Sequence, residues 1–338
     1  MRQVEKGYLI SYGADKKVIL WNLKDSTSFL LYQTPQEASL IAVNFRYPLL
    51  AVAKQETAEI VDLTSGKTLF KCLCFQSRIS SMTFHPKKDI LLVGAQNGNI
   101  YQWYYTKTML REAKNKDSLR ESQKIIERYV AHSVPVKSVV YHPSGEFFLS
   151  LDAEGNLLVW QPYSLDPFKG QWDKSVTEDY YFTDKPQFVG PTALLKDGEE
   201  LVISKAGKFL GVGNTDGIVK IVLIRGLKSL LTFKAHKGLI YHLALLTNKE
   251  GKIAQVATVG RDGYVRVWGI KKEAFLYNNN ESNKVLKLPL KESDPLSLVG
   301  EYLLPELPRQ VLFINEKELA VGTKSGSIVI LNLNSRGL

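Results

Sequence analysis

One segment shows the repeating unit of this chain most clearly, and it reads Arg261-Asp262-Gly263-Tyr264-Val265-Arg266-Val267-Trp268. Its Asp-Gly pair supplies the positive φ of a tight hairpin turn, and the alternation that follows is typical of a strand with one buried face. The same pattern occurs in seven copies along the chain, which end at residues 21, 61, 103, 160, 222, 268 and 331. The segment is therefore one copy of an internal repeat.

The turn position of the repeat is mostly glycine. The last five copies place it five residues before their end, as Gly98, Gly155, Gly217, Gly263 and Gly326, and the first two copies carry Lys16 and Glu56 there. Successive copies end 40 to 63 residues apart. The short intervals match one four-stranded blade of roughly 40–45 residues. The longer intervals imply insertions, which we place around residues 104–128, 161–192 and 270–300.

These repeats predict an all-β chain. One four-stranded blade cannot bury both of its faces, whereas seven blades arranged radially bury one another. We therefore expect residues 1–338 to form a single seven-bladed β-propeller domain. The first copy begins at Tyr8, which leaves residues 1–7 for a missing inner strand, and the final copy ends near Leu333. We expect an incomplete first or last blade, the seventh lacking its outer strand.

The repeats resemble the WD-repeat family over nearly the whole chain, although no Trp-Asp dipeptide is present. Members of that family often link a His, a strand Ser or Thr, a turn Asp and the Trp within one blade. By this resemblance the sixth copy supplies His236, Thr258, Asp262 and Trp268. The fourth copy supplies His132, Ser150 and Trp160, with Glu154 in place of the Asp. The first copy offers Ser11, Asp15 and Trp21 without a His.

The sequence does not predict an enzyme. It contains no HExxH zinc motif, no phosphate-binding Walker loop, no GxSxG nucleophile motif and no paired CxxC. Its two cysteines, Cys72 and Cys74, are too few for a disulfide framework or a zinc site, and we expect free thiols. We therefore expect no catalytic residue, no metal and no cofactor. No run of eighteen apolar residues is present, so no membrane insertion is expected.

Charge is unevenly distributed along the chain, whose net charge is +10. Residues 146–184, which include an aromatic insertion, hold eight acidic and two basic residues, whereas residues 225–272 hold ten basic and two acidic residues. Such asymmetry could orient an encounter with a charged partner, or it could reflect solvated loops and strands. The charged segment Lys107–Arg128 could likewise be a short helix, a solvated loop or a docking arm.

The WD-repeat resemblance also implies where partners bind, namely at the strand starts and turns that meet at one end of the blades. The corresponding turn residues here are Lys54, Gln96, Arg261 and Lys324, and the strand-start residues are Arg78, Lys137, Tyr241 and Arg309. Several cations on one rim suit an acidic or phosphorylated peptide.

The function that we expect is a non-catalytic protein-interaction scaffold, a part of a larger hetero-complex inside the cell, cytoplasmic or nuclear. The alternative is a module that binds nucleic acid or ribonucleoprotein through the basic residues 225–272.

Overall fold

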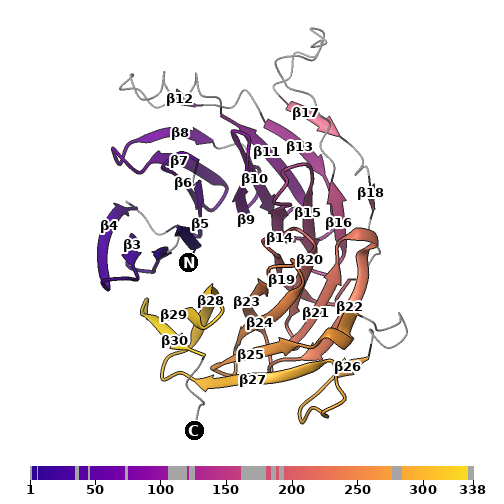
Figure 1. Cartoon of the computed structure of the whole chain (residues 1–338). Coiled ribbons are helices and arrows are strands. Elements are labelled where there is room, and N and C mark those ends of the chain that lie inside the picture. Colours follow the sequence, from indigo (N-terminus) through magenta and orange to yellow (C-terminus); the bar gives the residue numbers. More distant parts are fainter. Residues whose placement is uncertain are drawn as a thin grey trace. The chain divides into compact units, whose positions relative to one another are not determined.

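The described part of the chain is almost entirely β-structure. The structure is a computed structural model, and it describes residues 2–5, 7–34, 38–44, 46–72, 75–105, 120–121, 126–160, 180–183, 188–189, 194–275 and 284–333. These residues form seven sheets that follow one another along the chain, which we number 1 to 7 (Figure 1). Within the described residues there is no α-helix, only two short 3-10 helices, η1 (Arg225–Leu227) and η2 (Lys272–Phe275). The prediction of an all-β chain with seven blades is confirmed.

The chain divides into two compact units, and the first comprises residues 1–36 and 193–338. It holds sheets 1, 5, 6 and 7, each built around an antiparallel meander. Their strands are, in sheet 1, β1 (Arg2–Glu5), β2 (Tyr8–Tyr12), β3 (Lys17–Asn22) and β4 (Thr27–Gln33); in sheet 5, β19 (Gly198–Ile203), β20 (Phe209–Asn214), β21 (Ile218–Leu223) and β22 (Lys228–Lys234), with β26 (Val285–Leu286); in sheet 6, β23 (Ile240–Thr247), β24 (Ile253–Gly260), β25 (Tyr264–Ile270) and β27 (Leu296–Leu303); and in sheet 7, β28 (Pro308–Asn315), β29 (Glu318–Thr323) and β30 (Ile328–Asn332).

That residues 1–338 form a single domain stays a prediction. The second unit comprises residues 37–192 and holds sheets 2, 3 and 4. Its strands are, in sheet 2, β5 (Leu40–Asn44), β6 (Leu49–Lys54), β7 (Thr57–Asp62) and β8 (Thr68–Cys72), with β12 (Arg120–Glu121); in sheet 3, β9 (Ile79–Phe84), β10 (Ile90–Ala95), β11 (Asn99–Tyr104) and β13 (Ile126–Val130), with β17 (Tyr180–Thr183); and in sheet 4, β14 (Val136–Tyr141), β15 (Phe148–Asp152), β16 (Leu157–Trp160) and β18 (Phe188–Val189).

Each of the three predicted insertions contributes a short strand to the sheet that precedes it. The insertion between β11 and β13 supplies β12, which pairs in parallel with β8 of sheet 2. The insertion after β16 supplies β17, which pairs with β13 of sheet 3, and the one after β25 supplies β26, which pairs with β22 of sheet 5. The insertions therefore cover the outer edges of sheets 2, 3 and 5. Most of Lys107–Arg128 and of residues 161–192 lies outside the described residues, so the alternatives for them stay open.

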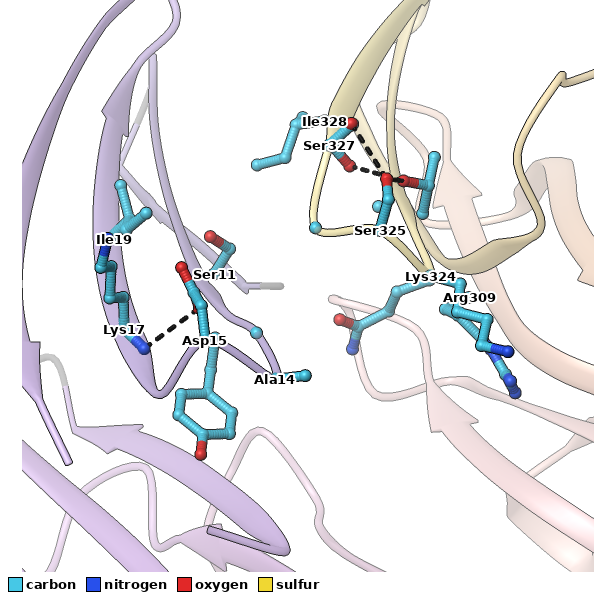
Figure 2. A pocket seen from close by; sticks show the side chains of 16 residues that line it. Ser11, Ala14, Asp15, Lys17, Ile19, Arg309, Lys324, Ser325, Ser327 and Ile328 are labelled. Carbon is cyan, nitrogen blue, oxygen red and sulfur yellow. Dashed lines mark hydrogen bonds between the residues drawn. The ribbon is translucent and has the colours of Figure 1, made fainter. Parts of the chain in front are cut away.

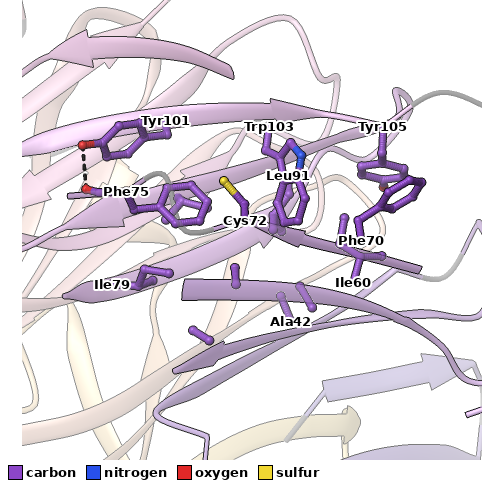
Figure 3. Close-up of a cluster of buried hydrophobic side chains, with 14 of the residues drawn as sticks. Ala42, Ile60, Phe70, Cys72, Phe75, Ile79, Leu91, Tyr101, Trp103 and Tyr105 are labelled. Carbon is purple, nitrogen blue, oxygen red and sulfur yellow. Dashed lines mark hydrogen bonds between the residues drawn. The ribbon is translucent and has the colours of Figure 1, made fainter. Parts of the chain in front are cut away.

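Neighbouring sheets bury aromatic side chains between them. In the second unit, sheets 2 and 3 enclose Phe70, Phe75, Tyr101 and Trp103, all at most 1% exposed (Figure 3). The rings of Phe75 and Tyr101 meet edge to face at 5.3 Å, a favourable geometry for aromatic pairs. Burial of this apolar surface between sheets is what a single blade cannot achieve alone.

In the first unit, sheets 5 and 6 approach closely through strand glycines. A Cβ on Gly213 of β20 would lie 2.6 Å from Cγ2 of Ile240 in β23, and one on Gly211 would lie 2.5 Å from Cδ1 of Leu243. Such distances are shorter than real carbon contacts, so only glycine lets the two strands pack this tightly.

Residues 2–5 form β1, the inner strand for which the sequence left residues 1–7, so sheet 1 has four strands in total. Two other expectations about details of the chain are corrected. In sheet 2 the residue with positive φ is Gln55 and not Glu56, because Lys54 pairs with Thr57 across a two-residue turn. Cys72 is disulfide-bonded and not a free thiol, and Cys74 lies outside the described residues.

Candidate binding surface

The predicted partner-binding residues lie at one rim of each sheet, which we call the turn rim. It holds the turn between the second and third strands and the start of the first strand. In five sheets the residue just after the second strand donates its backbone N–H to the carbonyl of the residue just before the first strand. These bonds are Gln96 to Arg78, Ala153 to Pro135, Arg261 to Leu239 and Lys324 to Leu307, each at 2.9 Å, and Thr215 to Asp197 at 3.2 Å. The backbone therefore holds predicted turn and strand-start positions next to each other.

In the second unit, two of the four predicted residues are exposed. Arg78 and Gln96 are exposed and adjacent on sheet 3, through the backbone bond just described. Lys54 is mostly covered, because its ammonium lies 3.6 Å from the carboxylate of Glu59. Lys137 is partly buried and has interactions of its own. Arg78 and Gln96 are thus the residues of this group that present free side-chain surface.

In the first unit, the three predicted cations Arg261, Arg309 and Lys324 are exposed on the turn rim of sheets 6 and 7. The guanidinium of Arg309 lies 4.1 Å from the centre of the Tyr241 ring, within the range of a cation–π interaction. Tyr241 therefore supports Arg309 from the neighbouring sheet. Sequence reasoning named both residues, but their contact depends on the packing of sheet 6 against sheet 7.

A pocket of about 230 Å³ lies between sheets 1 and 7 of the same unit (Figure 2). Lys17 and Asp15 come from its sheet 1 side, and Arg309 and Lys324 come from its sheet 7 side. The remaining lining residues include Ser11, Ile19, Thr323, Ser325, Ser327 and Ile328. Sequence reasoning missed Lys17, Ser325 and Ser327. The Lys-Ser-Gly-Ser turn at residues 324–327 was the available signal, since it concentrates hydroxyls beside a cation.

The charge balance of this pocket favours anions. Its cations are Lys17, Arg309 and Lys324, and its one lining acid is Asp15, whose carboxylate accepts the backbone N–H of Lys17 at 3.2 Å. Glu306 lies beside it and accepts hydrogen bonds from Ser325 and, at 2.7 Å, from Thr323. These hydrogen bonds lower the pKa of Glu306. The three cations outnumber the two acids Asp15 and Glu306, so the pocket can hold a carboxylate or phosphate through charge-assisted bonds from the cations.

The His, Thr, Asp and Trp that the WD-repeat resemblance assigns to the sixth copy are joined by consecutive hydrogen bonds in sheet 6. Trp268 donates to the Thr258 hydroxyl at 3.1 Å, Thr258 Oγ1 lies 2.9 Å from Nε2 of His236, and Nδ1 of His236 lies 2.7 Å from Asp262. Burial lowers the pKa of His236, which keeps the ring neutral, so Nδ1–H donates to Asp262 and Thr258 donates to Nε2. Although burial acts against it, hydrogen bonds from His236 and Arg266 hold the pKa of Asp262 well below its usual range.

Sheet 4 repeats this network with a different acid. His132 lies 2.7 Å from the Ser150 hydroxyl, and Trp160 donates to the same hydroxyl at 2.8 Å. The acid that meets His132, at 2.9 Å, is Asp152 and not Glu154, the residue that the repeat alignment placed there. Asp152 stands two positions earlier and also accepts the backbone N–H groups of Glu154 and Asn156. In both sheets these groups are buried and stabilise a turn.

No catalytic constellation emerges from the described residues. Among them there is no group of three His, Cys, Asp or Glu residues that could hold a metal ion. The closest titratable pair on neighbouring inner strands is His242 and Glu200, 3.5 Å apart. Burial lowers the pKa of His242 to about 3 and raises that of Glu200 to about 8, so both are neutral near pH 7. The two helices of the described residues, η1 and η2, are single short turns, and neither could span a lipid bilayer.

Three segments match the protein-family model described as "WD domain, G-beta repeat", at residues 66–104, 123–161 and 227–269. The fold is similar over 97% of the chain to the structure titled "Crystal structure of WD40 beta propeller domain of Doa1", with a TM-score of 0.63, 17% identity and 90% of that chain covered. A chain of the "Crystal Structure of Mitotic Checkpoint Complex" gives a TM-score of 0.64 at 11% identity, with 98% and 91% coverage. The protein is thus a β-propeller. More specifically, three of its segments are similar to WD repeats.

Two curated relatives show how far the sequence similarity extends. A "p21-activated protein kinase-interacting protein 1-like" protein of Danio rerio is 25% identical over 258 residues, 70% of this chain and 65% of that protein. A "Serine-threonine kinase receptor-associated protein" of Gallus gallus is 23% identical over 167 residues, 49% of this chain and 42% of that protein. The match spans less than two thirds of either relative's length.

Proposed function

We propose that this protein is a non-catalytic protein-interaction scaffold that works inside the cell as one member of a larger assembly. The observation that carries the proposal is the group of exposed cations Arg261, Arg309 and Lys324 on the turn rim of sheets 6 and 7. The names of two relatives, a kinase-interacting and a kinase-receptor-associated protein, support an interaction role.

The partner class is an acidic or phosphorylated segment of another protein. Arg309 is held against Tyr241, so part of the entropic cost of fixing its guanidinium is met before a ligand arrives. Lys17 and Lys324 approach the pocket from opposite sides (Figure 2). A carboxylate or phosphate placed between them gains contacts from both sheets.

The experiment compares two triple variants with equal changes in net charge. One reverses the turn rim, as Arg261→Glu, Arg309→Glu and Lys324→Glu. The other reverses Lys205, Lys249 and Lys317, exposed lysines in the turns at the opposite rim of sheets 5, 6 and 7. Each tagged protein is captured from cells at moderate salt, and the bound proteins are identified by mass spectrometry.

Loss of bound proteins from the turn-rim variant, with retention by the control, is the expected result. An identical set of bound proteins on both variants and the wild type overturns the assignment of the turn rim. Comparable melting temperatures for the three proteins exclude unfolding as the cause.

The alternative, nucleic-acid binding through residues 225–272, is favoured by the net charge of +10. Against it, the basic residues of this segment do not share one rim: Arg261 and Lys237 lie at the turn rim, whereas Lys249 and Lys252 lie at the opposite one. Arg266 is 7% exposed and pairs with Asp262 at 2.8 Å. Titration of single-stranded RNA binding against salt separates the two, since a steep loss of affinity with salt would favour nucleic acid.

A further inference from the structure

One carboxylate holds the hydroxyls at the edge of the pocket between sheets 1 and 7. Glu306 lies in the segment 304–307, which joins β27 to β28, and its Oε2 accepts hydrogen bonds from Thr323, at 2.7 Å, and from Ser325. Ser327 is a further donor to the same carboxylate. All three hydroxyl residues line the pocket, whereas Glu306 does not (Figure 2). The hydroxyls that an anion in the pocket could use are therefore already bound to an acid of the chain itself.

Hydroxyl groups, and not cations, hold the Glu306 carboxylate in this position. The hydrogen bonds from Ser325, Thr323 and Ser327 lower the pKa of Glu306, so the carboxylate is ionised near neutral pH. Within the part of the chain that the structure describes, Glu306 forms no ion pair with a cation. The cations of the pocket are therefore not engaged by Glu306, although they line the same pocket as the hydroxyls that it binds.

The side chain of Glu306 can move without its backbone. Leu304 donates its N–H to the carbonyl of Gly263 at 3.5 Å, and the carbonyl of Leu307 accepts the N–H of Lys324 at 2.9 Å. The two ends of the segment are thus fixed to sheets 6 and 7. Glu306 itself is exposed, and exposed side chains change rotamer within nanoseconds. Displacement of its carboxylate therefore needs only rotation about side-chain bonds.

The hydroxyls, by contrast, are held in place by the turn that carries them. Thr323 is 8% exposed, its Oγ1 lies 2.9 Å from Oγ of Ser325, and that atom lies 3.1 Å from Oγ of Ser327. Gly326 closes the turn by donating its N–H to the carbonyl of Thr323 at 3.2 Å. A buried polar group that loses its partner costs free energy, so these hydroxyls favour an acceptor. An anion that replaces Glu306 supplies one.

The charges at the site indicate which anion fits it. With Glu306 in place, the cations Lys17, Arg309 and Lys324 face the carboxylates of Asp15 and Glu306. Once Glu306 has moved away, only Asp15 remains, and the excess of positive charge rises from one to two. A phosphate monoester carries about −1.5 to −2 charges near pH 7 and has three acceptor oxygens, whereas a carboxylate carries a single charge. The site without Glu306 therefore matches a phosphorylated side chain better than an aspartate or a glutamate.

We propose that Glu306 is an internal competitor at this site, and that a phosphorylated serine or threonine of a partner protein displaces it from Thr323 and Ser325. The phosphate takes over both hydroxyl bonds and adds charge-assisted bonds from the cations. The pocket volume of about 230 Å³ lies below the roughly 300–1,000 Å³ of sites for drug-sized ligands, so it suits a single side chain. This inference rests on the proposed function, because it uses the turn-rim cations, and it adds the modification of the partner and the residue that restrains binding.

The test measures the affinity of the protein for two short peptides, acetyl-Gly-phosphoserine-Gly-amide and acetyl-Gly-Glu-Gly-amide. Titrations follow the backbone amide NMR signals of residues 324–327, which form the turn beside the pocket. Glu306→Ala removes the competitor, whereas Glu306→Gln removes its charge and keeps an amide oxygen that accepts from the hydroxyls. Glu316→Gln is the matched control, because Glu316 is an exposed glutamate in the turn at the opposite rim of sheet 7.

We expect Glu306→Ala to bind the phosphoserine peptide at least about fivefold more tightly than the wild type, because the phosphate no longer competes for two hydrogen bonds. Glu306→Gln should gain less, since its amide oxygen still competes, and Glu316→Gln should bind as the wild type does. Glu306→Ala should bind the glutamate peptide at least about fivefold more weakly than the phosphoserine peptide. Comparable melting temperatures show that the variants fold.

An affinity of Glu306→Ala for the phosphoserine peptide at or below that of the wild type overturns the proposal, because it would mean that Glu306 only supports the turn. Equal gains in Glu306→Ala and Glu306→Gln would mean repulsion without displacement, and equal affinities for the two peptides would remove the preference for phosphate. Lys324→Gln separates the two proposals. Phosphoserine affinity that this substitution leaves unchanged contradicts the proposed function, whereas a loss with Lys324→Gln but no gain with Glu306→Ala contradicts the role of Glu306 alone.

Discussion

The indole N–H of Trp268 donates a hydrogen bond to the hydroxyl of Thr258, ten residues earlier on the neighbouring strand. The same bond joins Trp160 to Ser150 and Trp21 to Ser11, each at 2.8 Å. In sheet 3 the corresponding pair is Trp103 and Val93, and the buried indole N–H of Trp103 has no acceptor among the described residues. One sheet therefore lacks a hydrogen bond that three others possess.

Val93→Thr is expected to restore that bond. A threonine hydroxyl in the register of Thr258 would accept the N–H of Trp103, so the substitution should be neutral or stabilise the protein by up to about 1 kcal/mol. Val212→Thr is the matched control, because Val212 is equally buried at the same place in sheet 5, where Val222 stands instead of a tryptophan. It should cost about 1–3 kcal/mol. Urea unfolding measures both, and equal losses would contradict this account of Trp103.

The acid that contacts His132 in the structure is Asp152, whereas the repeat led us to expect Glu154. Asp152→Asn weakens the bonds to His132 and to two backbone N–H groups, and should lower the free energy of unfolding by about 1.5–3 kcal/mol. Glu154→Gln should change it by less than about 0.5 kcal/mol, as is usual for a surface position. Thermal melting of the two variants tests this, and the reverse order would restore Glu154 to the network.

The pH dependence of stability should report on His85. Its Nδ1 accepts the backbone N–H groups of Lys87 and Lys88, and its Nε2 donates to Gly145, all at 2.9 Å. This arrangement suits only the neutral ring, and burial lowers the pKa of His85 to about 4. The unfolded chain, with a histidine pKa near 6.5, therefore binds more protons between these values, so stability falls as the pH drops from 7 to 5, by about 2 kcal/mol from this residue.

Urea unfolding at pH 7 and pH 5 measures this effect. His85→Gln should reduce the loss between these pH values by about that amount, since glutamine can still donate to Gly145 without titrating. His142→Gln, in the corresponding turn of sheet 4, is the control. A wild-type loss that persists undiminished in His85→Gln would show that other groups cause it.

The close approach of sheets 5 and 6 can be tested at Gly213. Gly213→Ala places a Cβ 2.6 Å from Ile240 and should cost about 1–3 kcal/mol, although alanine in a strand is otherwise favoured over glycine. Ile240→Ala removes the opposing methyl groups, so the double variant should be more stable than the sum of the single effects predicts. A double-mutant cycle from urea unfolding measures this coupling, and strict additivity would show that the two residues do not oppose each other.

The repeat in the sequence was sufficient to predict the seven sheets and where the chain is interrupted. Hairpin turns and strand alternation are local, so glycines such as Gly263 and Gly155 mark them directly. The same reasoning placed the turn of sheet 2 one residue late, at Glu56, because without a glycine nothing in the sequence distinguished it from Gln55. It also preferred Glu154 to Asp152, because aligning the repeats does not show which acidic side chain contacts His132.

For the candidate surface, the sequence supplied the residues but not their contacts. Arg309 and Tyr241 are 68 positions apart, and their stacking at 4.1 Å depends on how two sheets pack. Lys17 belongs to the pocket only because sheet 1 lies opposite sheet 7.

The sequence alone determined the elements of this protein, because turn conformation and the alternation of side chains depend on residues a few positions apart. Only the tertiary structure decided that insertions pair with the preceding sheets and that Trp103 lacks an acceptor among the described residues. Each of these depends on groups far apart in the chain, and their proximity follows from packing between sheets, which no local pattern records.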